Sequence, residues 1–487
     1  MAIHVPNEIL SDIMRYLVPA LPSERRKWRY DSSLRPSDLA SLCLVSRRFR
    51  HVAQPLLYHT IDVTQSTTAE GQAPNWHWPG LLLKTIVKNP DLAKYIRVLA
   101  IPDMLFLPPT ADMIFLPDTS PTGFPWDVPR CIRNALEPEI EYNSYTLPVI
   151  ALLLYAPMVE KIILFSGDPG SVEVKWILTS WHPQGQRYDP AIDFGPDLTR
   201  DLGPFANYGL PCLKDLHVDL QESEHGVTPL LDFLKKPGLS IFHLSHARSF
   251  TGLLVPRPLR DSLSGVRELN LSDCYIEPLS LENILRSCPR LEALGVHVAE
   301  PSWAEELLQQ SNPNIFWTIN LGDFGQTLRG FGESLTDLHL DFSPYKTARP
   351  VTGRIGSLRS MSKLRHLQCD RNDLVLDQSL GEELEDNTLP LDSVLPSSIT
   401  TLRIHYIAHD ISLSLPGSVI SADMESLLSS RRLQSLKQVQ LRRYNPIFED
   451  EIDLSQPSML GWSFKYWKTP ANVGNGFLEC LYSERSG

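Results

Sequence analysis

Two histidines separated by two residues, His243 and His246, have the spacing in this chain that comes closest to a metal site. A zinc ion needs three or four convergent ligands, and no third ligand stands beside this pair. We therefore predict no metal centre and interpret the two histidines as ordinary polar residues.

Motifs for nucleophilic or phosphate chemistry are missing from the sequence. It contains no Gly-x-Ser-x-Gly elbow, no phosphate loop ending in Gly-Lys, and no Gly-x-Gly-x-x-Gly fingerprint. We therefore expect no catalytic residues and no cofactor. An enzyme with an unrecognised site in its long loops stays as the weaker alternative.

Carboxylates and histidines recur instead at alternate positions of several short apolar segments. Alternate residues of a β-strand point to the same side, so these side chains would share one exposed face. We expect that face to bind a protein substrate through a basic segment, although soluble residues on any exposed strand would give the same pattern. The candidate residues are Asp215, His217, Asp219, Glu268, Asp337, His339, Asp341 and Asp370.

The segments that carry them follow the pattern apolar-x-x-apolar-x-apolar, with the clearest copy at residues 266–276. Further copies begin at Ile96, Val159, Leu213, Leu239, Leu291, Leu335, Leu364, Ile399 and Leu436. Copies at 213, 239, 266 and 291 lie 26, 27 and 25 residues apart. This spacing fits the leucine-rich-repeat template and predicts a parallel sheet on the concave side of an arc, with helices behind it. Ordinary strands of an α/β domain remain the alternative.

The amino-terminal stretch predicts a small helical domain. Ile9, Ile13, Tyr16 and Leu17 share one side of a helix whose first turn holds Pro6. A second helix is expected from Ser37 or Asp38 to a point before Pro55. A domain of about sixty residues buries little apolar surface by itself. We therefore expect a partner to cover part of it.

This stretch resembles an F-box over about the first sixty residues, through its initial Pro, the run Glu8-Ile9-Leu10, a Leu-rich second helix and the run Val45-Ser46-Arg47-Arg48-Phe49. It departs from the family pattern at Val5, at Phe49 and in its long connection from Val18 to Ser37. The resemblance implies docking onto the Skp-type adaptor of a cullin-RING ubiquitin ligase. The docking residues it implies are Val5, Pro6, Ile9, Leu10, Ile13, Leu39, Leu42, Val45 and Phe49.

Composition excludes several other classes. The 487 residues carry a net charge of −12, which disfavours nucleic acid as a partner. The seven cysteines are dispersed without a Cys-x-x-Cys pair, as expected of reduced thiols in the cytoplasm or nucleus. We find no secretory leader and no membrane span, and expect no membrane partner.

The sequence thus predicts an α/β protein, with F-box helices followed by an irregular leucine-rich-repeat solenoid. We divide it into an F-box domain (1–60), a linker with the first repeat helix (61–95), the array (96–445) and a cap (446–487). The combination resembles F-box proteins of filamentous fungi. It implies a non-catalytic adaptor of a Skp-cullin-F-box ligase. The alternative is an interaction scaffold that binds a Skp-type or other partner without directing ubiquitination.

Overall fold

The computed structural model forms two compact units, which we describe separately. Unit 1 comprises residues 1–225 and 236–242, and unit 2 comprises residues 226–235 and 243–487. The structure describes residues 5–18, 36–62, 77–101, 152–153, 155–165, 210–220, 234, 236, 238–247, 264–274, 276, 278–298, 319–343, 351–375, 389–406, 417–443, 462–468 and 478–485.

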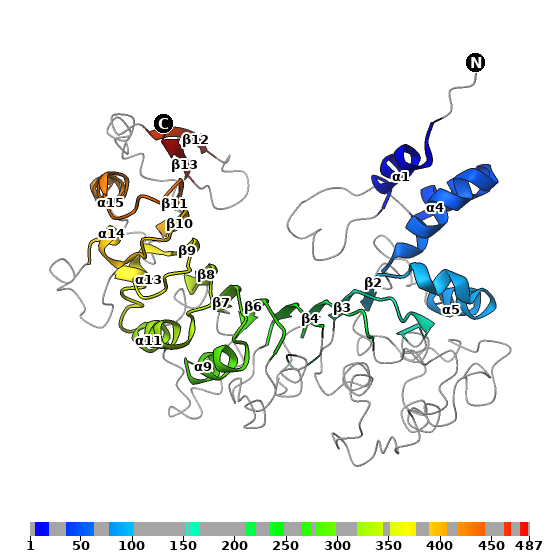
Figure 1. Ribbon diagram of the computed structural model, residues 1–487, viewed down its shortest axis with the longest axis horizontal. Helices are drawn as coiled ribbons and strands as arrows, with labels where there is room; N and C mark the ends of the chain where they lie inside the picture. The colour runs from blue at the N-terminus through cyan, green and yellow to red at the C-terminus, as the bar shows by residue number, and fades with distance from the viewer. Residues whose placement is uncertain are drawn as a thin grey trace, which may run out of the picture. The chain divides into compact units, whose positions relative to one another are not determined.

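Unit 1 begins with three helices, α1 (Asn7–Arg15), α3 (Pro36–Val45) and α4 (Arg47–His59) (Figure 1). The single second helix expected from the sequence is wrong in two respects. Ser46 is extended and caps α4 by accepting a hydrogen bond from the Phe49 N–H at 3.2 Å, which separates α3 from α4. The helix also continues through Pro55, because Leu56 and Leu57 beyond it pack against the helical core.

The other described parts of unit 1 are parallel strands and two further helical segments. Strand β1 (Thr60–Asp62) starts directly after α4 and pairs with β2 (Val98–Ile101). Strands β3 (Lys161–Phe165) and β4 (Asp215–Asp219) follow in order, also parallel. Helix α5 (His77–Lys88) and the short helix η2 (Pro90–Tyr95) precede β2. The region expected as a linker from residue 61 therefore begins inside β1.

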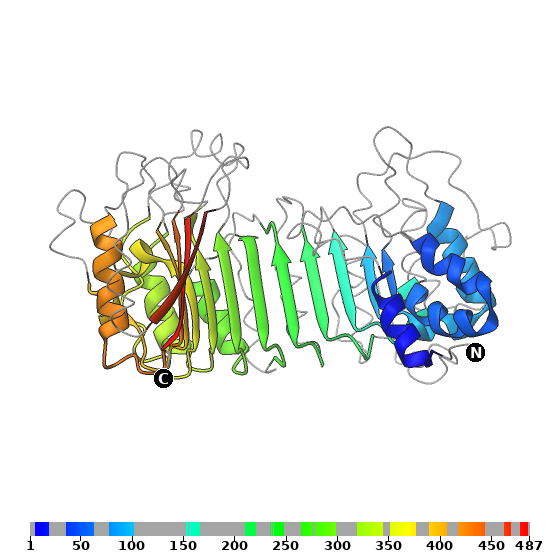
Figure 2. The same cartoon turned by 90° about the horizontal axis from the view of Figure 1, so that it is seen from above.

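Unit 2 places its strands in one sheet, mostly in chain order. Parallel neighbours are β6 (Glu268–Cys274), β7 (Ala293–Val298), β8 (Asp337–Asp341), β9 (His366–Asp370), β10 (Thr401–Tyr406) and β11 (Gln438–Arg443). Strand β5 (Ile241–Ser245) contributes its last three residues to this unit. Figure 2 shows the strand arrows of unit 2 side by side.

The described helices of unit 2 cover one face of its sheet, and we call the opposite face the open face (Figure 1). They are α9 (Pro278–Ser287), α11 (Leu321–Phe331), α13 (Arg371–Val375), α14 (Leu391–Val394) and α15 (Gly417–Ser429). No helix in the described ranges is long and apolar enough to cross a bilayer.

The strand positions expected from the apolar pattern are confirmed. Each of the ten copies gives a strand that starts two residues after its first apolar residue, as for Val266 and β6. Burial alternates along these strands, with Leu269 and Leu271 inside and Glu268 and Asn270 on the open face. The carbonyl oxygen before each strand commonly accepts two N–H groups from the next, as Glu292 does from Thr336 and Asp337.

The region expected as a cap (446–487) contains two described strands. It forms a hairpin of β12 (Trp462–Lys468) and β13 (Leu478–Arg485), and β13 pairs antiparallel with β11. The Trp-rich strand is therefore outermost, because the chain returns to place β13 against the array.

Candidate functional site

Helix α1 has two apolar stripes that face in different directions. Leu10, Met14 and Leu17 pack into the core formed with α3 and α4. The neighbouring stripe stays in solvent, with Ile9 48%, Ile13 56% and Tyr16 81% exposed. Because one stripe suffices to hold α1 in place, the second is available to another protein.

The end of α3 adds further exposed apolar surface. Leu44 is 80% and Val45 is 65% exposed. Leu39, which we expected among the docking residues, is only 1% exposed and belongs to the helical core, because it lies on the side of α3 that faces α4. The remaining expected docking residues are half-buried or exposed: Val5, Pro6, Leu10, Leu42 and Phe49.

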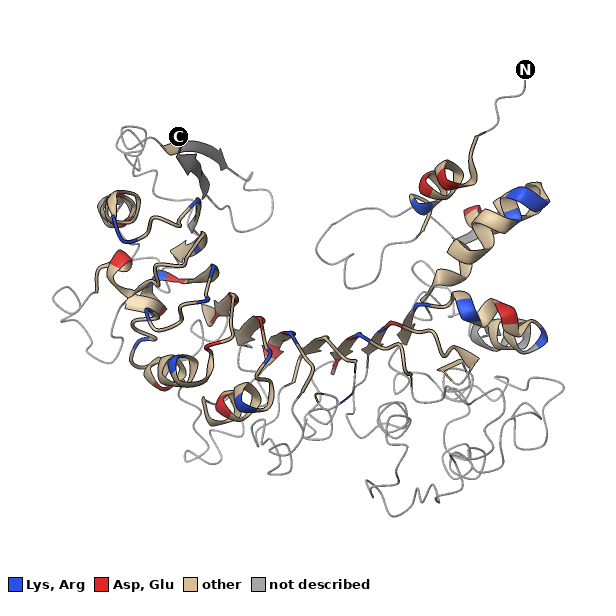
Figure 3. Cartoon of the chain, viewed as in Figure 1, with Lys and Arg blue, Asp and Glu red and all other residues tan. Residues whose placement is uncertain are grey.

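Arg48 holds the beginning of α1 against the beginning of α4. Its guanidinium donates to the Val5 carbonyl oxygen and, at 2.9 Å, to the Asn7 side-chain oxygen. Arg47, Arg48 and Arg50 form a basic group at this end of α4, as Figure 3 shows. The apolar residues Leu44 and Val45 directly precede this clamp.

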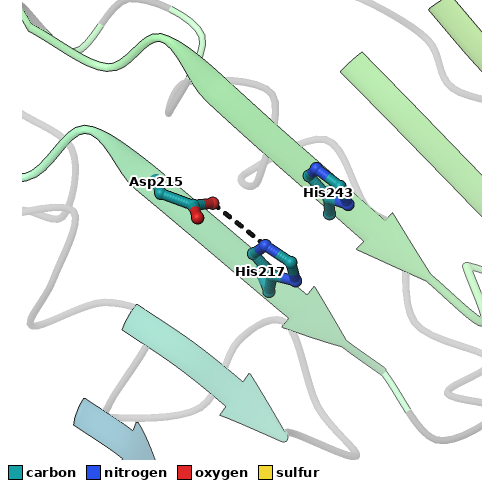
Figure 4. A group of neighbouring side chains, drawn as sticks. All are labelled: Asp215, His217 and His243. Carbon is teal, nitrogen blue, oxygen red and sulfur yellow. Dashed lines mark ion pairs between the residues drawn. The ribbon is translucent and has the colours of Figure 1, made fainter. Parts of the chain in front are cut away.

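In unit 1 the expected acidic face is largely neutralised by its own neighbours. Asp215 forms an ion pair with His217 at 3.0 Å, shown in Figure 4, and another with Lys161 at 2.9 Å. Burial opposes ionisation of Asp215, but these two partners lower its pKa. Asp219 lies half-buried on the same face.

In unit 2, Asp341 is also held by neighbours. His297 lies between Asp273, 3.1 Å away, and Asp341, 3.6 Å away. The hydrogen bond with Asp273 raises the pKa of His297 against the effect of its burial, and Asp341 adds to the rise. Burial opposes ionisation of Asp341, but hydrogen bonds from Ser343 and the nearby His297 lower its pKa.

Asp370 does not lie on the open face, which corrects our expectation. It is 2% exposed, and its side chain accepts a hydrogen bond from the Asn372 N–H at 2.7 Å. The cause is the turn from β9 directly into α13, which folds the end of the strand under the helix.

The remaining expected residues of unit 2 converge on a groove of about 330 Å³ across β6 to β10. Glu268, Asp337 and His339 line it, and strand register brings them together: Ala293 lies between Glu268 and Asp337, and Gly295 lies directly opposite His339. The hollow exists because β7 contributes these two small residues to its open face. Its other lining side chains are Asn270, His366, Gln368, Thr401 and Arg403.

Sequence reasoning missed parts of both surfaces. Tyr16 and Leu44 are exposed apolar residues that the resemblance did not assign to docking. Ala293, Gly295 and Arg403 also line the groove, which nothing in the sequence singled out. A small residue in two successive outward positions of one strand is the signal that could have found it.

Among known protein families, a match was found for the helical part of the chain. Residues 3–64 match the F-box-like family model. The amino-terminal region is thus an F-box-like domain. A search of curated proteins gave no match.

Proposed function

We propose that this protein is the substrate-recognition adaptor of a Skp-cullin-F-box ubiquitin ligase. The observation that supports this most directly is the exposed stripe Ile9, Ile13 and Tyr16 within a domain that matches the F-box-like family. F-box domains generally bind Skp-type adaptors, and an apolar stripe of this kind gains stability when a second protein covers it.

The docking surface we propose includes Ile9, Ile13, Tyr16, Leu44 and Val45. Five exposed large apolar residues on two neighbouring helices supply the apolar centre that protein interfaces require. The basic group at Arg47, Arg48 and Arg50 would attract acidic groups at the rim of the adaptor.

The remainder of the chain would hold the substrate. We propose that residues 96–445 form an irregular leucine-rich-repeat array and residues 446–487 its cap. The regular return of a parallel strand and the open strand face of unit 2 support this. The protein performs no chemistry in this proposal. It raises the effective concentration of a substrate lysine near the ubiquitin-loaded enzyme, in the cytoplasm or nucleus.

The test is capture of a purified Skp-type adaptor by the full chain. Replacing both Ile9 and Ile13 by serine should reduce capture about tenfold or more, because each change removes apolar area from the contact. Leu81→Ser on α5 is the matched control, since Leu81 is 63% exposed but lies outside the three helices.

Capture that is unchanged in the double variant would contradict the docking surface. Co-purification of the cullin from cells then separates a ligase from an interaction scaffold. A ligase adaptor brings the cullin with it, whereas a scaffold outside the ligase does not.

A further inference from the structure

The groove on unit 2 carries two opposite charges that its own neighbours leave uncompensated. Within the described residues, the Asp337 side chain bonds to the Thr336 hydroxyl at 2.6 Å and to no cation. Arg403 donates to the side-chain oxygens of Gln440 at 2.6 Å and Gln368 at 2.9 Å, and to no carboxylate of the described ranges.

The acidic end of the groove has room for a side chain. Glu268 and Asp337 lie on β6 and β8, on either side of Ala293. With strands about 4.8 Å apart, the two carboxylates flank a gap of about 10 Å whose floor is the small Ala293. Glu268 also lies 3.3 Å from His243, so Asp337 is the more open acceptor.

Gly295, on the same strand as Ala293, leaves space on the open face for a neighbouring side chain. A Cβ on Gly295 would lie 2.7 Å from the Asn270 side-chain oxygen, so the Asn270 amide already occupies that space. The amide gives the groove a hydrogen-bonding group beside its acidic end, on β6.

The basic end is rigid. The two glutamine oxygens hold the Arg403 guanidinium from both sides, on β9 and β11. A fork held in this way loses less side-chain entropy when it binds a carboxylate.

We propose that this groove binds an extended peptide segment of the substrate protein. That segment carries both a basic and an acidic side chain. The basic side chain enters between Glu268 and Asp337 over Ala293, and the acidic one pairs with Arg403. This inference rests on the proposed function, because it names the segment by which the adaptor holds its substrate.

The geometry also sets the spacing of the two charges. The chain crosses three strand intervals from β7 to β10, about 14 Å at about 4.8 Å for each interval. An extended peptide advances about 3.3 Å per residue, so its basic and acidic residues should stand about four positions apart.

The test is selection of random twelve-residue peptides displayed against the full chain. Enrichment of a basic and an acidic residue about four positions apart is the expected result. A synthetic peptide from the selection, measured by fluorescence anisotropy, should bind about tenfold more weakly to D337N and R403Q, and A293L should fill the hollow and weaken binding similarly.

Matched controls are E333Q and R359Q, which remove exposed charges outside the groove lining and should leave peptide affinity unchanged. Selection without the paired charges, or equal affinity for D337N and the unchanged chain, would overturn the inference. Adaptor capture by D337N should stay intact. A full-length chain that captures the adaptor but selects no such peptide contradicts the groove alone, and a chain that binds the selected peptide but fails to capture the adaptor contradicts the proposed function alone.

Discussion

At the scale of single residues, the histidine between two carboxylates has the clearest electrostatic consequence. His297 contacts Asp273 and Asp341, and His246 approaches Asp273 from the other side at 3.6 Å. Burial lowers the pKa of His339, the nearby Asp341 opposes this change, and His297 adds to the lowering. The charged form of His297 thus links β7 to β8 and to the end of β6.

This arrangement predicts a pH dependence with a definite sign. Because the folded pKa of His297 is raised, its stabilisation is fully present below the unfolded value of about 6.5 and is lost as pH rises through the folded pKa. Titration of the His297 ring by NMR should show the raised pKa. D273N should lower it, and an unchanged value in that variant would contradict the assignment.

The same scale explains which expected binding residues remain available. Asp215 and Asp341 are paired with neighbouring side chains, and Asp370 is buried, whereas Asp337 and Arg403 line the groove on the open face of unit 2. Residue type and position in the sequence were enough to place these side chains on strands. The neighbouring side chains in the folded protein determine which of them can bind a ligand.

At the scale of elements, α11 shows how closely a helix packs behind the sheet of unit 2. Asn320 caps it by accepting a hydrogen bond from the Gly322 N–H at 2.9 Å. A Cβ added to Gly325 would stand 2.0 Å from the Ile355 carbonyl oxygen, whereas one on Gly330 would meet nothing within 4 Å.

These two glycines give a matched pair of variants. Gly325→Ala should lower the free energy of unfolding by about 1–3 kcal/mol, because the helix or the segment at Ile355 must move. Gly330→Ala should raise it by about 0.5–1 kcal/mol, because alanine restricts the unfolded chain and favours the helix. Urea unfolding of both variants checks the prediction, and a loss of stability in Gly330→Ala would contradict it.

At the scale of the whole chain, the parallel order leaves strand edges that need protection. In unit 2 the edge of β11 is covered by β13, whose Leu481 and Cys480 oppose Gln440 and Leu441. Unprotected edges pair with other chains, so this hairpin has a protective role.

Removing the hairpin should therefore promote self-association. A chain ending at residue 443 leaves β11 without its antiparallel neighbour. Light scattering should show a mass that rises with concentration more steeply than for the full-length chain, which is the control. The same concentration dependence in both chains would show that β11 does not need this cover.

Much of the local structure could be predicted from the amino-acid sequence. The apolar spacing located ten strands, because burial on one side of a strand has a period of two. The small size of the helical domain also led us to expect that a partner covers part of it, and this stays a prediction.

The contacts between residues far apart in the chain became clear from the folded structure. It separated the stripe Leu10, Met14 and Leu17 from the exposed stripe beside it, and it ended α3 at Ser46. It buried Asp370, and it set Ala293 between Glu268 and Asp337. These outcomes depend on strand register and helix packing between residues far apart in the chain, which local spacing does not encode.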